Sequence, residues 1–205
     1  MTLPTTPTSA PVAYTPQASP KRTAAEIVTA AELGDEVLQL LNSDDVRGGP
    51  RELLAVMSAK ELFPQAVRFL AHALPRRECV WWAWVCARKA TSAEAPAAVR
   101  AALDATERWI VQPTEDNRRA AMQHAYAADL GTPAGCAALA AFFSGGSMGP
   151  PQAPPVPPGE FMTAKAAAGG ISLAAVAKEP ERAAERFREF LGLGLEVAER
   201  TKLWA

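Results

Sequence analysis

The sequence of 205 residues contains little of what most chemical sites are made from. It has two histidines, His72 and His124, and three cysteines, Cys79, Cys86 and Cys136. The cysteines have no CxxC spacing, so neither a zinc site nor a disulfide framework is expected, and reduced cytosolic thiols are the plain interpretation. No phosphate-binding loop and no regular calcium loop is present. The sequence therefore predicts no catalytic, cofactor-binding or metal-binding residue.

An excess of charge of either sign is also missing. The chain has 21 basic and 22 acidic residues and a formal net charge of −1. Nucleic-acid binders and membrane-surface proteins usually carry a basic excess, so neither kind of partner is expected. No stretch reaches the roughly 20 apolar residues that cross a bilayer, and the first residues lack the charge and apolar core of a secretory signal. These absences predict a cytoplasmic protein.

Aromatic residues make up only 7% of the chain, whereas alanine supplies much of the hydrophobic fraction of 49%. Alanine is the best helix former, and it fills little core volume. A β-sheet would need more valine, isoleucine, threonine and tyrosine. The composition therefore predicts an all-α protein, a compact and irregular multi-helix bundle or helical array whose helices pack closely through small residues.

Proline marks the organisation of the chain. Residues 1–21 contain five prolines and are predicted to be a disordered tail, because proline disrupts both helices and sheets. Residues 22–205 are predicted to form a single helical domain. Within it, the Gly/Pro-rich residues 144–160, which we call the strap, carry six prolines, a composition that favours polyproline II. The strap is expected to cross the surface and lead to the last two helices.

Two predictions concern the faces along which helices pack. A helix is expected to begin after Thr114, which can cap it. Its buried face is expected at three larger residues, Met122, Tyr126 and Leu130. In the helix expected over roughly residues 163–177, Gly169 and Gly170 predict a close approach to a neighbouring helix.

The sequence ECVWWAWVCAR, residues 78–88, holds three of the five tryptophans and two of the three cysteines. From Cys79 to Ala87 the helical wheel is apolar all the way round, which predicts a helix buried on every side at the centre of the bundle. Buried free cysteine usually behaves as a small hydrophobic residue. Cys79 and Cys86 are therefore expected to be unreactive.

One edge of this helix keeps a functional interpretation open. Arg77 precedes Trp81 by four residues and Arg88 follows Trp84 by four, so cation–π stacks are expected at these pairs. We call these four residues the tryptophan edge. Tryptophan and arginine are typical anchors of binding surfaces, although a structural core is the favoured interpretation. In the alternative, an enzyme or small-ligand protein would use a pocket formed by this edge and His72.

Three motifs occur together in the order FLAHALPRRECVWWAWVCAR, AAFFSGGSMGPPQAPPVPP and ERFREFLGLGLEVA. With these motifs the chain, over roughly residues 23–202, resembles an uncharacterised bacterial family of alanine-rich helical proteins. The resemblance brings no known catalytic residue. It implies a role near type VI secretion genes, as an accessory or adaptor protein.

These observations together predict a non-enzymatic protein-interaction module, a cytoplasmic accessory or adaptor factor of a bacterial secretion apparatus. A protein partner is expected, and neither a cofactor, a nucleic acid nor a membrane. The candidate interaction surface combines the tryptophan edge with the strap residues Pro154 and Pro155, which could dock into an aromatic groove of a partner. A nucleic-acid binder would instead need its two Arg-Arg pairs, residues 76–77 and 118–119, to converge on one face.

Overall fold

The computed structural model describes residues 21–43, 46 and 49–204. The described residues form ten α-helices and one short 3-10 helix, and no strand, which confirms the all-α prediction. In chain order the helices are α1 Ala24–Ala30, α2 Asp35–Leu41, α3 Pro50–Ala59, α4 Phe63–Ala73, α5 Arg76–Ala90, α6 Ala97–Val111, α7 Glu115–Ala127, α8 Pro133–Phe142, α9 Met162–Val176, η1 Pro180–Arg182 and α10 Ala183–Arg200. No described helix is long and apolar enough to cross a membrane.

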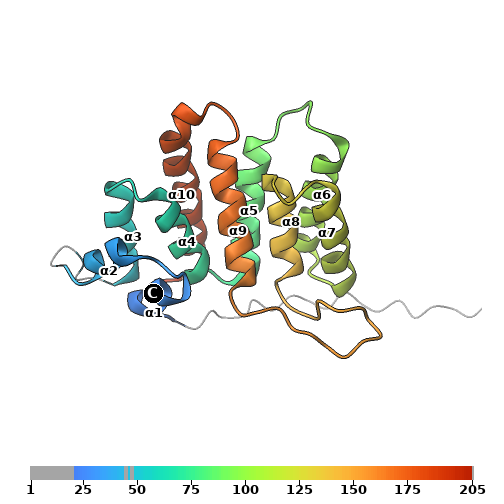
Figure 1. Cartoon of the computed structure of the whole chain (residues 1–205), viewed down its shortest axis with the longest axis horizontal. Helices are drawn as coiled ribbons and strands as arrows, with labels where there is room; N and C mark the ends of the chain where they lie inside the picture. Colours follow the sequence, from blue (N-terminus) through green and yellow to red (C-terminus); the bar gives the residue numbers. More distant parts are fainter. Residues whose placement is uncertain (1–20, 44–45, 47–48, 205) are drawn as a thin grey trace, which may run out of the picture.

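Helices α5, α8 and α9 form the centre of the molecule (Figure 1). On one side α6 and α7 pack against α8, and on the other α4 and α10 pack against α9, with α10 also contacting α5. The smaller helices α1, α2 and α3 join this second side through α4. The strap leaves the end of α8, crosses the bottom of the molecule as drawn, and enters α9, as the sequence predicts.

Capping residues account for several of the helix starts. The side chain of Thr23 accepts a hydrogen bond from the backbone of Glu26, and Glu26 accepts one from the backbone of Thr23, which completes a capping box. Thr114 caps α7 in the predicted way by accepting a hydrogen bond from Asn117 N. Pro75 directly precedes α5, the tryptophan helix, as proline commonly does because it needs no hydrogen-bond partner at a helix start.

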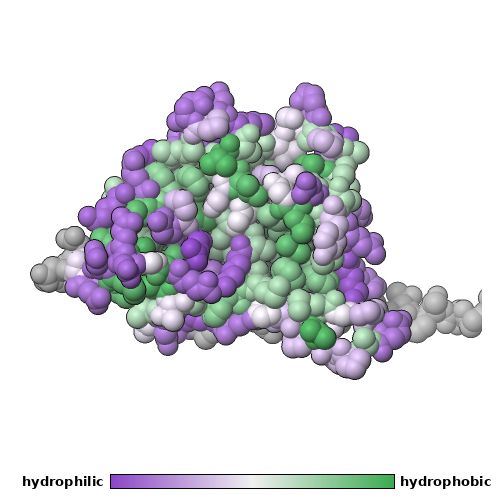
Figure 2. All heavy atoms as spheres, in the orientation of Figure 1, coloured by the Kyte–Doolittle hydropathy of each residue, from purple (hydrophilic) through white to green (hydrophobic). Residues whose placement is uncertain are grey.

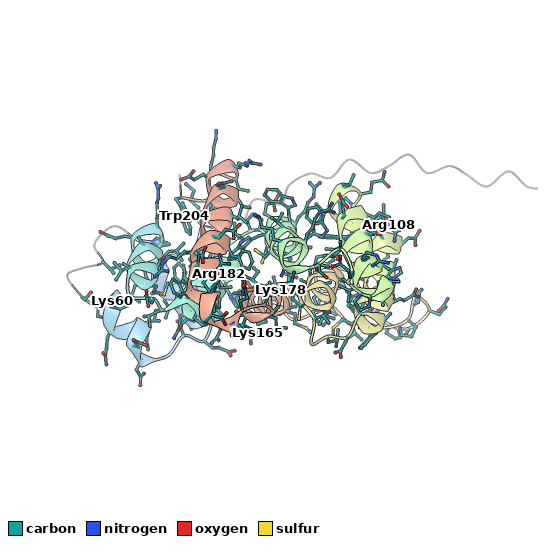
Figure 3. All side chains as sticks on the ribbon, turned by 90° about the horizontal axis from the view of Figure 1, so that it is seen from above. Lys60, Arg108, Lys165, Lys178, Arg182 and Trp204 are labelled. Atoms are coloured by element: carbon teal, nitrogen blue, oxygen red, sulfur yellow. The ribbon has the colours of Figure 1, made fainter. Side chains whose placement is uncertain are left out.

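Helix α5 is not buried on every side, so this prediction was wrong. Trp82 and both cysteines are buried, but Trp81, Trp84 and Val85 are half-buried. The reason lies in the packing of α5, whose neighbours are α8 and α9 on one side and α6 and α10 on its flanks. Figure 3 shows α5 from above between α10 and α6. The edge with Trp81 and Trp84 therefore reaches the surface.

The predicted buried face of α7 was also wrong. The buried residues of α7 are Arg118, Ala121 and Ala125, whereas Tyr126 is 61% exposed and Leu130 is 36% exposed. Alanines on the inner face let the backbone of α7 approach α6 and α8 closely, and the larger side chains are left on the outside.

Of the two glycines in α9, one makes the predicted close approach. A Cβ atom on Gly170 would lie 2.8 Å from Cys136 Cβ and 3.3 Å from Pro133 O, so α8 and α9 touch there. A Cβ atom on Gly169 would meet nothing within 4 Å, because this residue faces solvent. The exposed face over α8 and α9 is pale green in Figure 2, since it is made mostly of small, weakly hydrophobic residues.

Candidate interaction surfaces

The strap is attached to the helical body by arginine side chains that bind its backbone carbonyls. Arg118 donates from Nη1 to Phe142 O at 2.5 Å and from Nη2 to Ser147 O at 2.7 Å. Arg119 donates from Nη1 to Gly149 O at 3.0 Å. The two neighbouring arginines of α7 thus hold the first part of the strap in place.

Arg118 is the most deeply buried cation of the described residues, with 3% of its surface exposed. Its guanidinium group forms a two-point contact with Glu115, with Nε to Oε2 and Nη2 to Oε1 both at 2.7 Å, and lies 4.6 Å from the ring centroid of Phe142. Hydrogen bonds from Arg118 lower the pKa of the Glu115 carboxyl group, so this carboxyl group is ionised at neutral pH. Pairing is what makes burial of this charge tolerable.

The far end of the strap is held by two more arginines. Arg22 donates to Glu160 Oε1 at 2.6 Å and to His72 O at 3.1 Å, and its guanidinium carbon lies 5.0 Å from the Phe161 ring centroid. Arg76 reaches both ends, because it donates to Ser144 O at 3.1 Å and to Glu160 O at 3.5 Å. The strap is therefore tied at its beginning and its end.

Between these two anchors the strap closes into an exposed loop. Met148 N donates to Val156 O at 2.8 Å, and Ser147 Oγ accepts from Val156 N at 3.0 Å. All residues from Pro151 to Pro157 are exposed, including the two predicted interaction residues, Pro154 and Pro155. The loop is thus held rigidly at its base and displays its prolines to solvent.

The three tryptophans of α5 have different environments. Trp82 is buried, and its Nε1 donates to Phe190 O at 2.7 Å. Trp84 is half-buried and donates to Leu103 O at 3.0 Å. The guanidinium carbon of Arg88 lies 5.4 Å from the Trp84 ring centroid, which confirms this predicted cation–π pair. Trp81 is half-buried at the same outer edge.

The cation that the structure records over Trp81 comes from a distant part of the chain. The guanidinium carbon of Arg200, at the end of α10, lies 5.7 Å from the Trp81 ring centroid. Arg77 donates from Nε to Ile110 O at 2.8 Å and so joins α5 to α6. The predicted stack of Arg77 on Trp81 stays a prediction.

The structure does not bring His72 to the tryptophan edge. His72 is buried, its Nδ1 lies 2.7 Å from Arg68 O, and its ring lies 5.5 Å from that of Phe161. Burial raises the pKa of the Cys79 thiol to about 12, and it raises the pKa of Cys86 as well. Both thiols stay protonated at neutral pH, which makes them poor nucleophiles.

A pocket of about 150 Å³ lies at the C-terminal end of α5, next to the start of α10. Its walls include Lys178 and Arg182 (Figure 3), and no tryptophan. Arg182 pairs with Glu185 at 2.9 Å and Lys89 with Glu189 at 2.7 Å, so most of its charges neutralise one another. Among the residues that the structure describes, no group of three His, Cys, Asp or Glu side chains could hold a metal ion.

Sequence reasoning missed the arginines that tie the strap. It considered Arg118 only as part of a basic patch, and it gave Arg22 no role. The spacing of Glu115, Arg118 and Arg119 at i, i+3 and i+4 is a usable signal for an ion-pair group on one helix face. The pairing of Arg22 with Glu160 has no local signal, because 138 residues separate them.

Comparison with known proteins gives a family but no named relative. No curated protein matches the chain, and no solved structure matches it. One family model matches residues 53–198, which include both the tryptophan helix and the strap. The chain therefore belongs to the family of unknown function DUF6931.

Proposed function

We propose that this protein is a non-enzymatic protein-interaction module whose docking element is the strap. The observation that carries this proposal is the loop itself, with its exposed prolines above a base tied by four arginines. A loop needed only to join α8 to α9 would not require a buried, paired arginine at its base. Holding the loop rigid lowers the entropy that a partner must overcome when it binds.

The chemistry of the loop indicates the kind of partner. The stretch Pro154-Pro155-Val156-Pro157-Pro158 carries no charge, and none of its five residues lies in a helix, strand or turn. Polyproline segments are bound by grooves lined with aromatic side chains, which pack on the pyrrolidine rings. We therefore expect a protein partner with an aromatic groove that accepts an uncharged proline-rich segment.

A site-specific photo-crosslinker tests this proposal in the host cell. We would place it at Val156, which is 50% exposed at the loop, and as a control at Val176, which is 44% exposed. Val176 ends α9, about 20 Å along the helix from the strap. The proposal expects a distinct crosslinked protein from Val156 that is lost when Pro154 and Pro155 are replaced by glycine. Equal crosslinking from both positions would overturn it.

The alternative, an enzyme or small-ligand protein, requires a cavity that combines the tryptophan edge with His72. No observation favours it, because His72 packs against Phe161 and the described pocket is lined by other residues.

The arginines of the two Arg-Arg pairs form hydrogen bonds within the protein. Three of these four arginines bind strap carbonyls and Arg77 binds Ile110 O, which leaves little reason to propose a nucleic-acid partner.

The cytoplasmic location and the role in a secretion apparatus remain part of this proposal. The cytoplasmic location rests on the composition of the sequence, and the role in a secretion apparatus rests on the family resemblance. Tagging the protein in a bacterium that carries a type VI secretion system, and measuring secretion after its deletion, would test the second. Normal secretion in the deletion strain would remove it without affecting the proposed role of the strap.

A further inference from the structure

The outer edge of α5 has a hydrogen-bond donor that the described chain does not use. Trp82 and Trp84 both donate their indole N–H to backbone carbonyls. Trp81 Nε1 donates to no acceptor among the described residues, and its ring is half-buried at the surface. A half-buried tryptophan at the surface with an open N–H can bind a chain that offers both an apolar ring and a carbonyl oxygen.

The cations at this edge have open donors as well. Arg200 lies over the Trp81 ring, and within the described part of the chain it pairs with no carboxylate. Arg88 lies over the Trp84 ring, and the nearest approach to its partner Glu107 is a long 4.0 Å. Two aromatic rings flanked by guanidinium and indole donors are suited to a polyproline segment, which offers pyrrolidine rings and unpaired carbonyls.

This chain contains a segment with that chemistry outside the described residues. Residues 1–20 include five prolines and no Asp, Glu, Lys or Arg. Pro4 and Pro7 are three residues apart, which is one turn of a polyproline II helix, so their rings would lie on the same face. Because the segment has no charged side chain, its side chains can cover the two tryptophan rings without burying an ionised side chain.

The point where the described chain begins places this segment within reach. Arg22 and Arg76 both bind Glu160, so the described part of the chain begins near the start of α5. From Arg76 the helix rises about 8 Å to Trp81 and about 18 Å to Arg88. Twenty residues of polyproline II span about 60 Å. A tether of this length gives an effective concentration in the millimolar range, enough for a weak contact to form.

We infer that the segment of residues 1–20 binds the tryptophan edge of its own chain. Its pyrrolidine rings pack on Trp81 and Trp84, and Trp81 Nε1 and the Arg200 guanidinium donate to its carbonyls. This inference is independent of the strap, which lies at other residues.

The five indole N–H signals in a ¹⁵N NMR spectrum test the inference directly. We would compare the full chain with a variant that lacks residues 2–20, after assigning each signal through single Trp→Phe variants. The expected result is a shift of the Trp81 and Trp84 signals and an unchanged Trp82 signal, because Trp82 stays bound to Phe190 O. Unchanged Trp81 and Trp84 signals would overturn the inference.

A synthetic peptide of residues 1–20 separates the possible occupants of this edge. Added to the shortened chain, it should restore the shift of Trp81 in a saturable way, and a peptide with alanine at all five prolines should not. In the variant W81F, which keeps a ring but loses the N–H donor, binding of the peptide should weaken severalfold.

A shift in the full chain that disappears on dilution would show a second copy as the occupant and overturn the intramolecular form. Normal loop crosslinking from Val156 in the shortened chain would show that the strap proposal is unaffected.

Discussion

The two sides of the molecule are held together by different kinds of packing. Around α3 and α4 the core consists of large side chains, such as Leu53, Phe69 and Leu70. Around α7 and α8 the buried residues are mostly alanine, with the charged Arg118 among them. The first side gains stability from bulk removed from water, whereas the second gains it from close backbone approach and from polar contacts. Mutations that remove atoms and mutations that add them should therefore act differently on the two sides.

The largest expected effect is truncation on the bulky side. Replacing Leu53, which is fully buried in α3, with alanine should lower the free energy of unfolding by about 3–4 kcal/mol, because it removes apolar contacts and leaves a cavity. The matched change on the alanine side, Ala137→Gly in α8, should cost only about 1 kcal/mol, mostly through helix propensity. Urea unfolding followed by circular dichroism measures both. Equal losses would mean that the two sides do not differ in the proposed way.

Removal of the buried charge on the alanine side should have the next largest effect. Arg118→Met leaves the carbonyl of Phe142 without its side-chain donor and leaves that of Ser147 with only the longer bond of 3.3 Å from Arg119 Nη2, and an orphaned buried carbonyl costs about 1–3 kcal/mol. We expect a total loss of about 2–3 kcal/mol and faster hydrogen exchange in the strap. The control is Arg119→Met, whose side chain is 26% exposed, and which should cost less than 1 kcal/mol. If both variants were equally stable, Arg118 would not be what ties the strap.

The two adjacent glycines of α9 sharpen the comparison further. Gly170→Ala adds a methyl group against Cys136 Cβ and should cost about 1–2 kcal/mol. Gly169→Ala adds the same group in open solvent and should stabilise the protein by about 0.5–1 kcal/mol, because alanine favours the helix. Thermal unfolding of the two variants measures this difference in sign. Two changes of the same sign would show that α8 and α9 can move apart at little cost.

This contrast explains which features could be predicted from the sequence. Helix starts at Thr23, Thr114 and Pro75 follow from local capping chemistry, so they could be predicted. The buried face of α7 could not be, because hydrophobicity assigns the core to Tyr126 and Leu130 rather than to alanine. The exposure of the tryptophan edge depends on how far α6 and α10 cover α5, and this is a long-range property. The contacts of the arginines that tie the strap also depend on residues far apart in the sequence.

The smallest expected effect concerns the junction where the strap meets α4. Burial lowers the pKa of His72 below its usual value of 6.5, and the neighbouring cations Arg68, Lys165 and Arg22 act in the same direction. The folded protein therefore binds fewer protons than the unfolded chain once the pH falls below about 6.5. The contribution of His72 to stability should therefore decline as the pH falls from there.

The variant H72Q removes this titration, so its stability should change less with pH than that of the wild type between pH 6.5 and 5. The variant H124Q is the control, since it changes the other histidine, which lies in α7 and away from the strap junction. Urea unfolding at several pH values gives the slope of the unfolding free energy for each protein. Because the ring of His72 packs against Phe161 at the end of the strap, loss of stability should be accompanied by faster hydrogen exchange near Phe161. An equal slope in H72Q and the wild type would mean that the titration of His72 does not set the pH dependence of stability in this range.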